Sequence, residues 1–138
     1  MIEIKSKKER GKTLHIINKL EDFEGRIDLI PRNEFLQCCV VKKNKGIKFD
    51  THKHIFKETN YTKHIAQEAW LVFRGRIKCY YYDLDDTPLG TEILSSGDVS
   101  ITLYGGHTFE ILDDDTIIYE FKIGPYEGKN KDKELINE

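Results

Sequence analysis

The apolar residues of this chain alternate with polar ones or cluster in short runs, and they almost never recur at the spacing of an amphipathic helix. Turn residues separate these runs at intervals typical of a sandwich or a barrel, as at Arg74-Gly75, 83–88 and 95–98. The pattern therefore predicts a nearly all-β fold. The strands are expected at 14–18, 26–30, 35–42, 47–50, 68–73, 76–83, 90–94, 99–104, 107–112 and 116–123.

The length of 138 residues suits one domain with a packed core and is too short for two ordinary ones. We therefore treat 1–138 as a single domain. Its tail, 124–138, loses apolar content and ends in a charged stretch, so we expect it to be mobile or to cross the surface.

The composition argues against several classes of protein. A formal net charge of −2 gives no reason to expect a nucleic-acid partner, and no segment approaches the roughly 20 apolar residues that span a bilayer. The Lys-rich start lacks the apolar run of a signal peptide, which favours the cytoplasm. The cysteines Cys38, Cys39 and Cys79 are an odd set and are expected to be free, buried side chains.

A two-residue turn at Arg74-Gly75 would pair the strands on either side of it as a hairpin. Phe73 would then lie opposite Arg76. One face of the hairpin would carry Glu68, Trp70, Val72, Ile77, Cys79 and Tyr81. Glu68 is thus a carboxyl group on an apolar face, where it requires a partner or a raised pKa.

Two groups of histidines stand near these strands. His52 and His54 follow the run at 47–50 with the two-residue spacing that points both side chains to one side of a strand. His107 follows the double glycine Gly105-Gly106 on another expected strand, where Phe109 shares its face. His15 and His64 have no partner at such a spacing and are expected to be ordinary core or surface residues, although His64 could reach the mouth of a site.

These segments resemble the two sequence motifs of the cupin superfamily. In the first motif Gly46 precedes the pair His52 and His54, and Glu68 is followed after six residues by Gly75. The gap 55–67 is longer than the family minimum, so Glu58 is a competing carboxylate.

The second motif begins at Gly97 and ends at Gly105-Gly106 and His107. Leu103 stands where the family has proline, and His107 arrives one residue early. The likeness covers about 46–123.

The resemblance implies a cupin jelly roll, or conical β-barrel, of two antiparallel sheets, commonly as a homodimer. It also implies a metal site of His52, His54, Glu68 and His107. Three imidazoles and a carboxylate suit a divalent transition metal such as Fe, Mn, Ni, Co or Zn. The alternative is a metal-free cupin in which the histidines are ordinary pocket residues.

The segments 67–70, 82–86, 105–107 and 122–126 resemble small bacterial cupins that accompany surface-polysaccharide and nucleotide-sugar biosynthesis. This likeness implies a metal-dependent enzyme that isomerises or epimerises a sugar or nucleotide-linked sugar. The alternatives are a non-haem iron dioxygenase and a non-catalytic sugar-binding cupin. The expected catalytic residues are His52, His107 and Tyr81, and the expected substrate-binding aromatic residues are Trp70, Phe109 and Tyr119.

Overall fold

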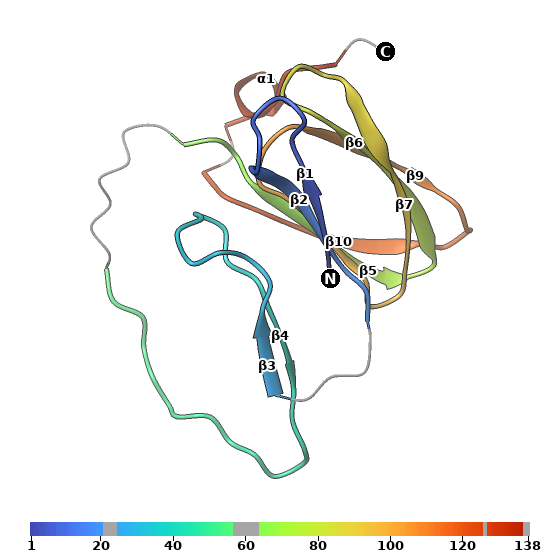
Figure 1. Ribbon diagram of the computed structural model, residues 1–138. Helices are drawn as coiled ribbons and strands as arrows, with labels where there is room; N and C mark the ends of the chain where they lie inside the picture. Colours follow the sequence, from blue (N-terminus) through green and yellow to red (C-terminus); the bar gives the residue numbers. More distant parts are fainter. Residues whose placement is uncertain (21–24, 57–63, 126, 137–138) are drawn as a thin grey trace.

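The computed structural model describes residues 1–20, 25–56, 64–125 and 127–136, and these residues form an all-β fold (Figure 1). Three antiparallel sheets contain the strands. The largest sheet has the order β1-β2-β8-β5-β10, a second has the order β7-β6-β9, and β3 and β4 form a ribbon. The bounds are β1 (Ile2–Lys5), β2 (Thr13–Asn18), β3 (Gly25–Asp28), β4 (Cys39–Lys42), β5 (Glu68–Arg74), β6 (Arg76–Tyr82), β7 (Pro88–Ser95), β8 (Val99–Thr102), β9 (Gly106–Ile111), β10 (Ile117–Lys122) and α1 (Lys129–Asp132).

The main core lies between the five-stranded and three-stranded sheets. Trp70 and Val72 of β5 contribute from one side, and Ile77, Cys79 and Tyr81 of β6 contribute from the other. All five side chains are buried. The predicted apolar face of 68–81 is therefore confirmed, but its two strands belong to opposite sheets.

The expected hairpin between these strands is wrong. β5 pairs with β8 on one edge and with β10 on the other, while β6 pairs with β7 and β9. Since both edges of β5 are already occupied, Gly75 carries the chain from one sheet to the other. A Cβ at Gly75 would collide with Thr116, so this crossing requires glycine.

A second core covers the outer face of the five-stranded sheet. Ile16, Ala69 and Ile101 face outward from neighbouring strands and pack against Leu29 and Ile30, which lie in the segment that connects β3 to β4. The centre of this sheet is therefore buried on both faces. This agrees with the burial of β2 and β8, in which consecutive side chains are buried on both faces of the sheet.

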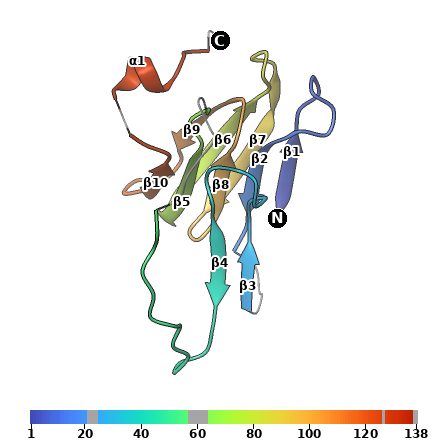
Figure 2. The same cartoon turned by 90° about the vertical axis from the view of Figure 1, so that its left-hand side faces the viewer.

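Three expectations about the strands and the cysteines are wrong. Residues 47–50 are not a strand, and the coil 43–56 runs out beside the sheets (Figures 1 and 2). The side chains of this coil are exposed. The strand β1 was not expected. Cys39 is exposed, although Cys79 is buried and all three cysteines are free. Among the described residues, no helix is long and apolar enough to cross a membrane.

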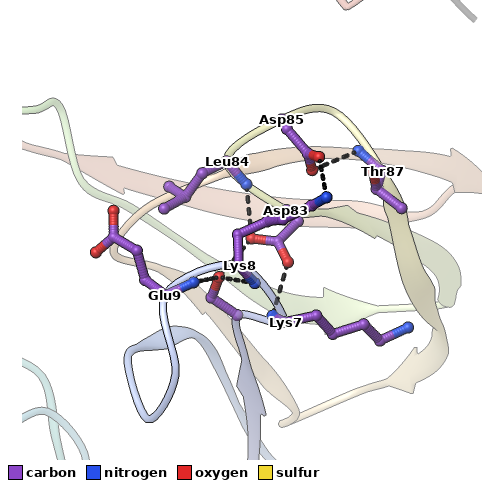
Figure 3. A network of polar contacts seen from close by, with 8 residues as sticks. Lys7, Lys8, Glu9, Asp83, Leu84, Asp85 and Thr87 are labelled. Carbon is purple, nitrogen blue, oxygen red and sulfur yellow. Dashed lines mark hydrogen bonds and ion pairs between the residues drawn. The ribbon is translucent and has the colours of Figure 1, made fainter.

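A buried carboxylate joins the turn after β1 to the turn after β6 (Figure 3). Asp83, which is 1% exposed, accepts hydrogen bonds from the Ser6 hydroxyl at 2.7 Å and from the backbone N–H groups of Lys7 and Leu84, each at 2.8 Å. Burial raises the pKa of Asp83, but these bonds together outweigh it and bring the pKa to about 2. The charged form of Asp83 therefore stabilises the contact between the two sheets.

We expect Asp83→Asn to lower the midpoint of urea unfolding at pH 7. Because the pKa of Asp83 falls from 3.8 to about 2 on folding, its stabilisation is complete above pH 4 and is lost as the pH falls toward 2. The difference between the variant and the parent should shrink over that window. Asp114→Asn, an exposed carboxylate in the turn before β10, is the matched control, and an equal effect of both substitutions would contradict the role given to Asp83.

Candidate functional site

A cavity of about 700 Å³ opens beside β5 and β9. Glu68 and Trp70 line it from β5, and His107 and Phe109 line it from β9. The C-terminal segment 132–136 forms a further wall. The cavity therefore brings together four of the residues that the sequence singled out.

The double glycine positions His107. Gly105 has a φ of +80°, and a Cβ there would lie 2.5 Å from the carbonyl oxygen of Tyr82. At Gly106 a Cβ would collide with the tip of Ile136 and press on Tyr82. Gly105 thus requires glycine for its backbone conformation and for the close approach of the Tyr82 carbonyl, whereas at Gly106 a larger residue would have to displace the tip of Ile136.

A chain of hydrogen bonds runs from the backbone of β6 through the interior to His107. The Nε2 atom of His15 lies 3.3 Å from the carbonyl oxygen of Tyr82. The Nδ1 atom of His15 lies 3.0 Å from the Thr102 hydroxyl, and the same hydroxyl lies 2.7 Å from Nδ1 of His107. One hydroxyl therefore links two imidazoles from different sheets.

The protons in this chain can be assigned because a carbonyl oxygen only accepts hydrogen bonds. His15 must donate from Nε2, so its Nδ1 is bare in the neutral ring and accepts the Thr102 hydrogen. The Thr102 oxygen then accepts from Nδ1–H of His107. As a result, Nε2 of His107 carries a lone pair at the cavity.

Both imidazoles are neutral at pH 7. Burial lowers the pKa of His15 to about 4, only partly opposed by the Tyr82 carbonyl and Asp83. Burial also lowers the pKa of His107 to about 4, and the positive charges of protonated His15 and of Lys133 add to this effect. The low pKa values agree with the proton positions that the hydrogen bonds require.

Glu68 faces the bare nitrogen of His107. Its Oε1 atom lies 3.6 Å from Nε2, and since His107 is neutral the two groups do not form an ion pair. Burial raises the pKa of Glu68, and the nearby Glu120 raises it further, against the opposing effects of Lys122, Trp70 and Lys133. Two hydrogen-bond acceptors that face each other at this distance are stabilised by a proton, a cation or a donor group of a ligand between them.

Trp70 completes the inner wall. Its ring stacks on His107 with centroids 4.2 Å apart and meets the edge of Phe109 at 4.7 Å. The indole N–H is turned toward the Glu68 carboxyl and lowers its pKa, yet it has no hydrogen-bond partner among the described residues. An unpaired buried donor costs about 1–3 kcal/mol, so a ligand oxygen would be favoured at this place.

The structure does not bring the remaining predicted residues to the cavity. His52 and His54 lie on the exposed coil 43–56, with their rings 5.3 Å apart, and Nδ1 of His52 lies 2.9 Å from the Asp50 carbonyl oxygen. Tyr81 is buried in the main core and bonds to Ser100 at 2.9 Å.

Tyr119 is exposed on β10 and does not line the cavity. Its ring contacts those of Phe73 and Phe121. His64 stacks on Phe35 with ring centroids 4.6 Å apart. Glu58 falls outside the described residues.

The metal expected from the cupin resemblance can be tested against this arrangement. Glu68 and His107 meet at the cavity, but His52 and His54 do not join them. Within the part of the chain that the structure describes, no group of three or more His, Cys, Asp or Glu side chains could hold a metal ion. The described arrangement therefore does not fit the four-residue ligand set.

Comparison of this chain with protein-family models, with curated proteins and with solved structures found no match. The likeness to cupins consequently depends on the motif residues alone. The function has to be argued from the geometry of the cavity.

Sequence reasoning missed His15 and Thr102. Neither lies in a recognisable motif, and 87 residues separate them along the chain. The available signal was a histidine, flanked by apolar residues, in the strand at 14–18, and a threonine in the predicted strand just before Gly105-Gly106. Only the pairing of β2 with β8, which puts His15 opposite Thr102, reveals that they act together.

The hydrogen-bond chain predicts opposite tautomers for two histidines. In two-bond ¹⁵N–¹H spectra at pH 7, His15 should carry its proton on Nε2, whereas His107 should carry it on Nδ1, which is the less common tautomer in water. Thr102→Val should abolish that preference in His107. The control Thr91→Val makes the same change at an exposed position of β7 and should leave both signals unchanged. Nε2–H signals from both rings in the parent protein would contradict the assignment.

Proposed function

We propose that this protein is an acid–base enzyme that isomerises a small sugar-like molecule in the cavity beside Glu68 and His107. The bare Nε2 atom of His107, fixed by the chain of hydrogen bonds through Thr102 and His15 to the Tyr82 carbonyl, is the observation that supports this most strongly. A neutral imidazole that donates a hydrogen bond to the interior from one nitrogen and presents the lone pair of the other to a cavity has the arrangement of a general base.

The two groups have complementary roles in this reaction. Nε2 of His107 takes a proton from the carbon next to a substrate carbonyl, and the C–H electron pair forms the double bond of an enediol. Glu68 gives a proton to the carbonyl oxygen, a role assisted by burial, which raises the pKa of its carboxyl group. Glu68 then removes the proton of the neighbouring hydroxyl, and His107 returns its proton to the adjacent carbon. The carbonyl has moved by one carbon, and both residues are restored.

The walls of the cavity suit such a substrate. The Trp70 indole N–H can donate to a substrate oxygen, and the faces of Trp70 and Phe109 provide apolar surface for the sugar ring. The five-stranded sheet opposite a three-stranded sheet, with His107 directly after a double glycine, supports the further proposal that the fold is a cupin jelly roll.

The proposal can be tested by incubating the protein with a panel of aldoses and ketoses and following their interconversion by ¹H NMR. We expect His107→Gln to lower the rate by at least about 100-fold, since a positioned general base contributes that much or more. Glu68→Gln should have an effect of similar size. His64→Gln, at an exposed position outside the cavity, is the matched control. Full activity of a folded His107→Gln variant would contradict the proposed reaction.

The metal ion implied by the cupin resemblance is a separate proposal, supported by the lone pairs of Glu68 and His107 that meet at the cavity. His52→Ala distinguishes it from the acid–base reaction. This variant should keep its activity if His107 and Glu68 act alone. Loss of activity together with loss of a stoichiometric metal, measured by elemental analysis of untagged protein, would instead favour the metal.

A further inference from the structure

The cavity has a strongly acidic wall. Its carboxyl side chains outnumber its lysines six to one, the six being Glu68, Asp83, Asp86, Glu120, Asp132 and Glu134. The lysine is Lys133. A wall of this kind holds a negative potential, and a cavity with low-dielectric walls concentrates that potential.

Neighbouring groups neutralise only part of this charge. Lys122 lies 3.3 Å from both Glu120 and Asp132. Asp83 is committed to Ser6 and to backbone N–H groups, which leave it ionised. Among the described residues, Asp86 and Glu134 have no ion-pair partner. The cavity therefore stays negative at neutral pH.

The Trp70 indole N–H is a second observation that favours a ligand in the cavity. The ring is 5% exposed, lines the cavity and has an N–H without a partner among the described residues. Close to it lies the acceptor Nε2 of His107. A hydroxyl group can accept from the indole and donate to the imidazole, whereas a fully ionised phosphate can only accept.

We propose that the cavity takes an unphosphorylated sugar, neutral or bearing an amino group, and excludes sugars that carry phosphate or a nucleoside diphosphate. This inference rests on the proposed function and narrows its substrate class. A nucleotide-linked sugar would bring its diphosphate charges against Asp86, Glu120 and Glu134, and like charges placed together across an interface oppose binding. An ammonium group would find these same carboxylates favourable.

The charge of the cavity can be measured without knowing the substrate, because Trp70 is the one tryptophan of the chain. Its fluorescence should be quenched by neutral acrylamide. The quenching constant of each ion is divided by its value for free N-acetyltryptophanamide at the same ionic strength. After this correction, caesium should quench Trp70 about tenfold more than iodide does. The double variant Asp86→Asn with Glu134→Gln should reduce this ratio. The control Asp114→Asn with Asp115→Asn removes as many charges from an exposed turn and should leave the ratio unchanged.

The second measurement compares glucosamine, glucose, glucosamine 6-phosphate and UDP-glucose by saturation-transfer NMR. The first two should receive saturation, and the phosphorylated pair should not. Stronger transfer to the phosphorylated pair, or equal quenching by caesium and iodide, overturns the inference. If none of the sugars receives saturation while caesium still quenches Trp70 more than iodide, the proposal of a sugar-like substrate is wrong. The exclusion of anions from the cavity is then still supported.

Discussion

The carbonyl oxygen of Tyr82 determines the protonation of the site because it can accept a hydrogen bond but cannot donate one. From this group the positions of the hydrogens on His15, Thr102 and His107 follow in turn. The chain of bonds also crosses between the sheets, since Tyr82 and His107 belong to the three-stranded sheet and His15 and Thr102 to the five-stranded sheet. The same contacts thus join the two halves of the fold and prepare the nitrogen that faces the cavity.

The sequence predicted the class of fold and the inward faces of its strands, because a period of two residues is a local property. Trp70 and Tyr81 are buried as expected. It did not predict which strands pair, since pairing depends on competition for strand edges along the whole chain. At Gly75 a short turn between two strands looked like a hairpin, but β8 and β10 already occupy both edges of β5.

The candidate site could be predicted in part for a similar reason. Glu68 and His107 each stand near a glycine turn in a recognisable spacing, and they meet in the structure. His15 could not be recognised in this way because its partners come from strands far away in sequence. The expectation for His52 depended on a strand at 47–50, and that segment is coil.

The single hydrogen of the Thr102 hydroxyl has a consequence for the path of a transferred proton. A relay from His107 through the Thr102 hydroxyl can pass a proton as far as the bare Nδ1 atom of His15, but the Tyr82 carbonyl at its inner end cannot take the proton onward. A proton that arrives on Nε2 of His107 thus has no exit beyond His15 and has to depart on the side of the cavity. In the proposed reaction, the hydrogen removed from one substrate carbon would remain available for delivery to the next carbon, so the geometry favours internal return of the same isotope.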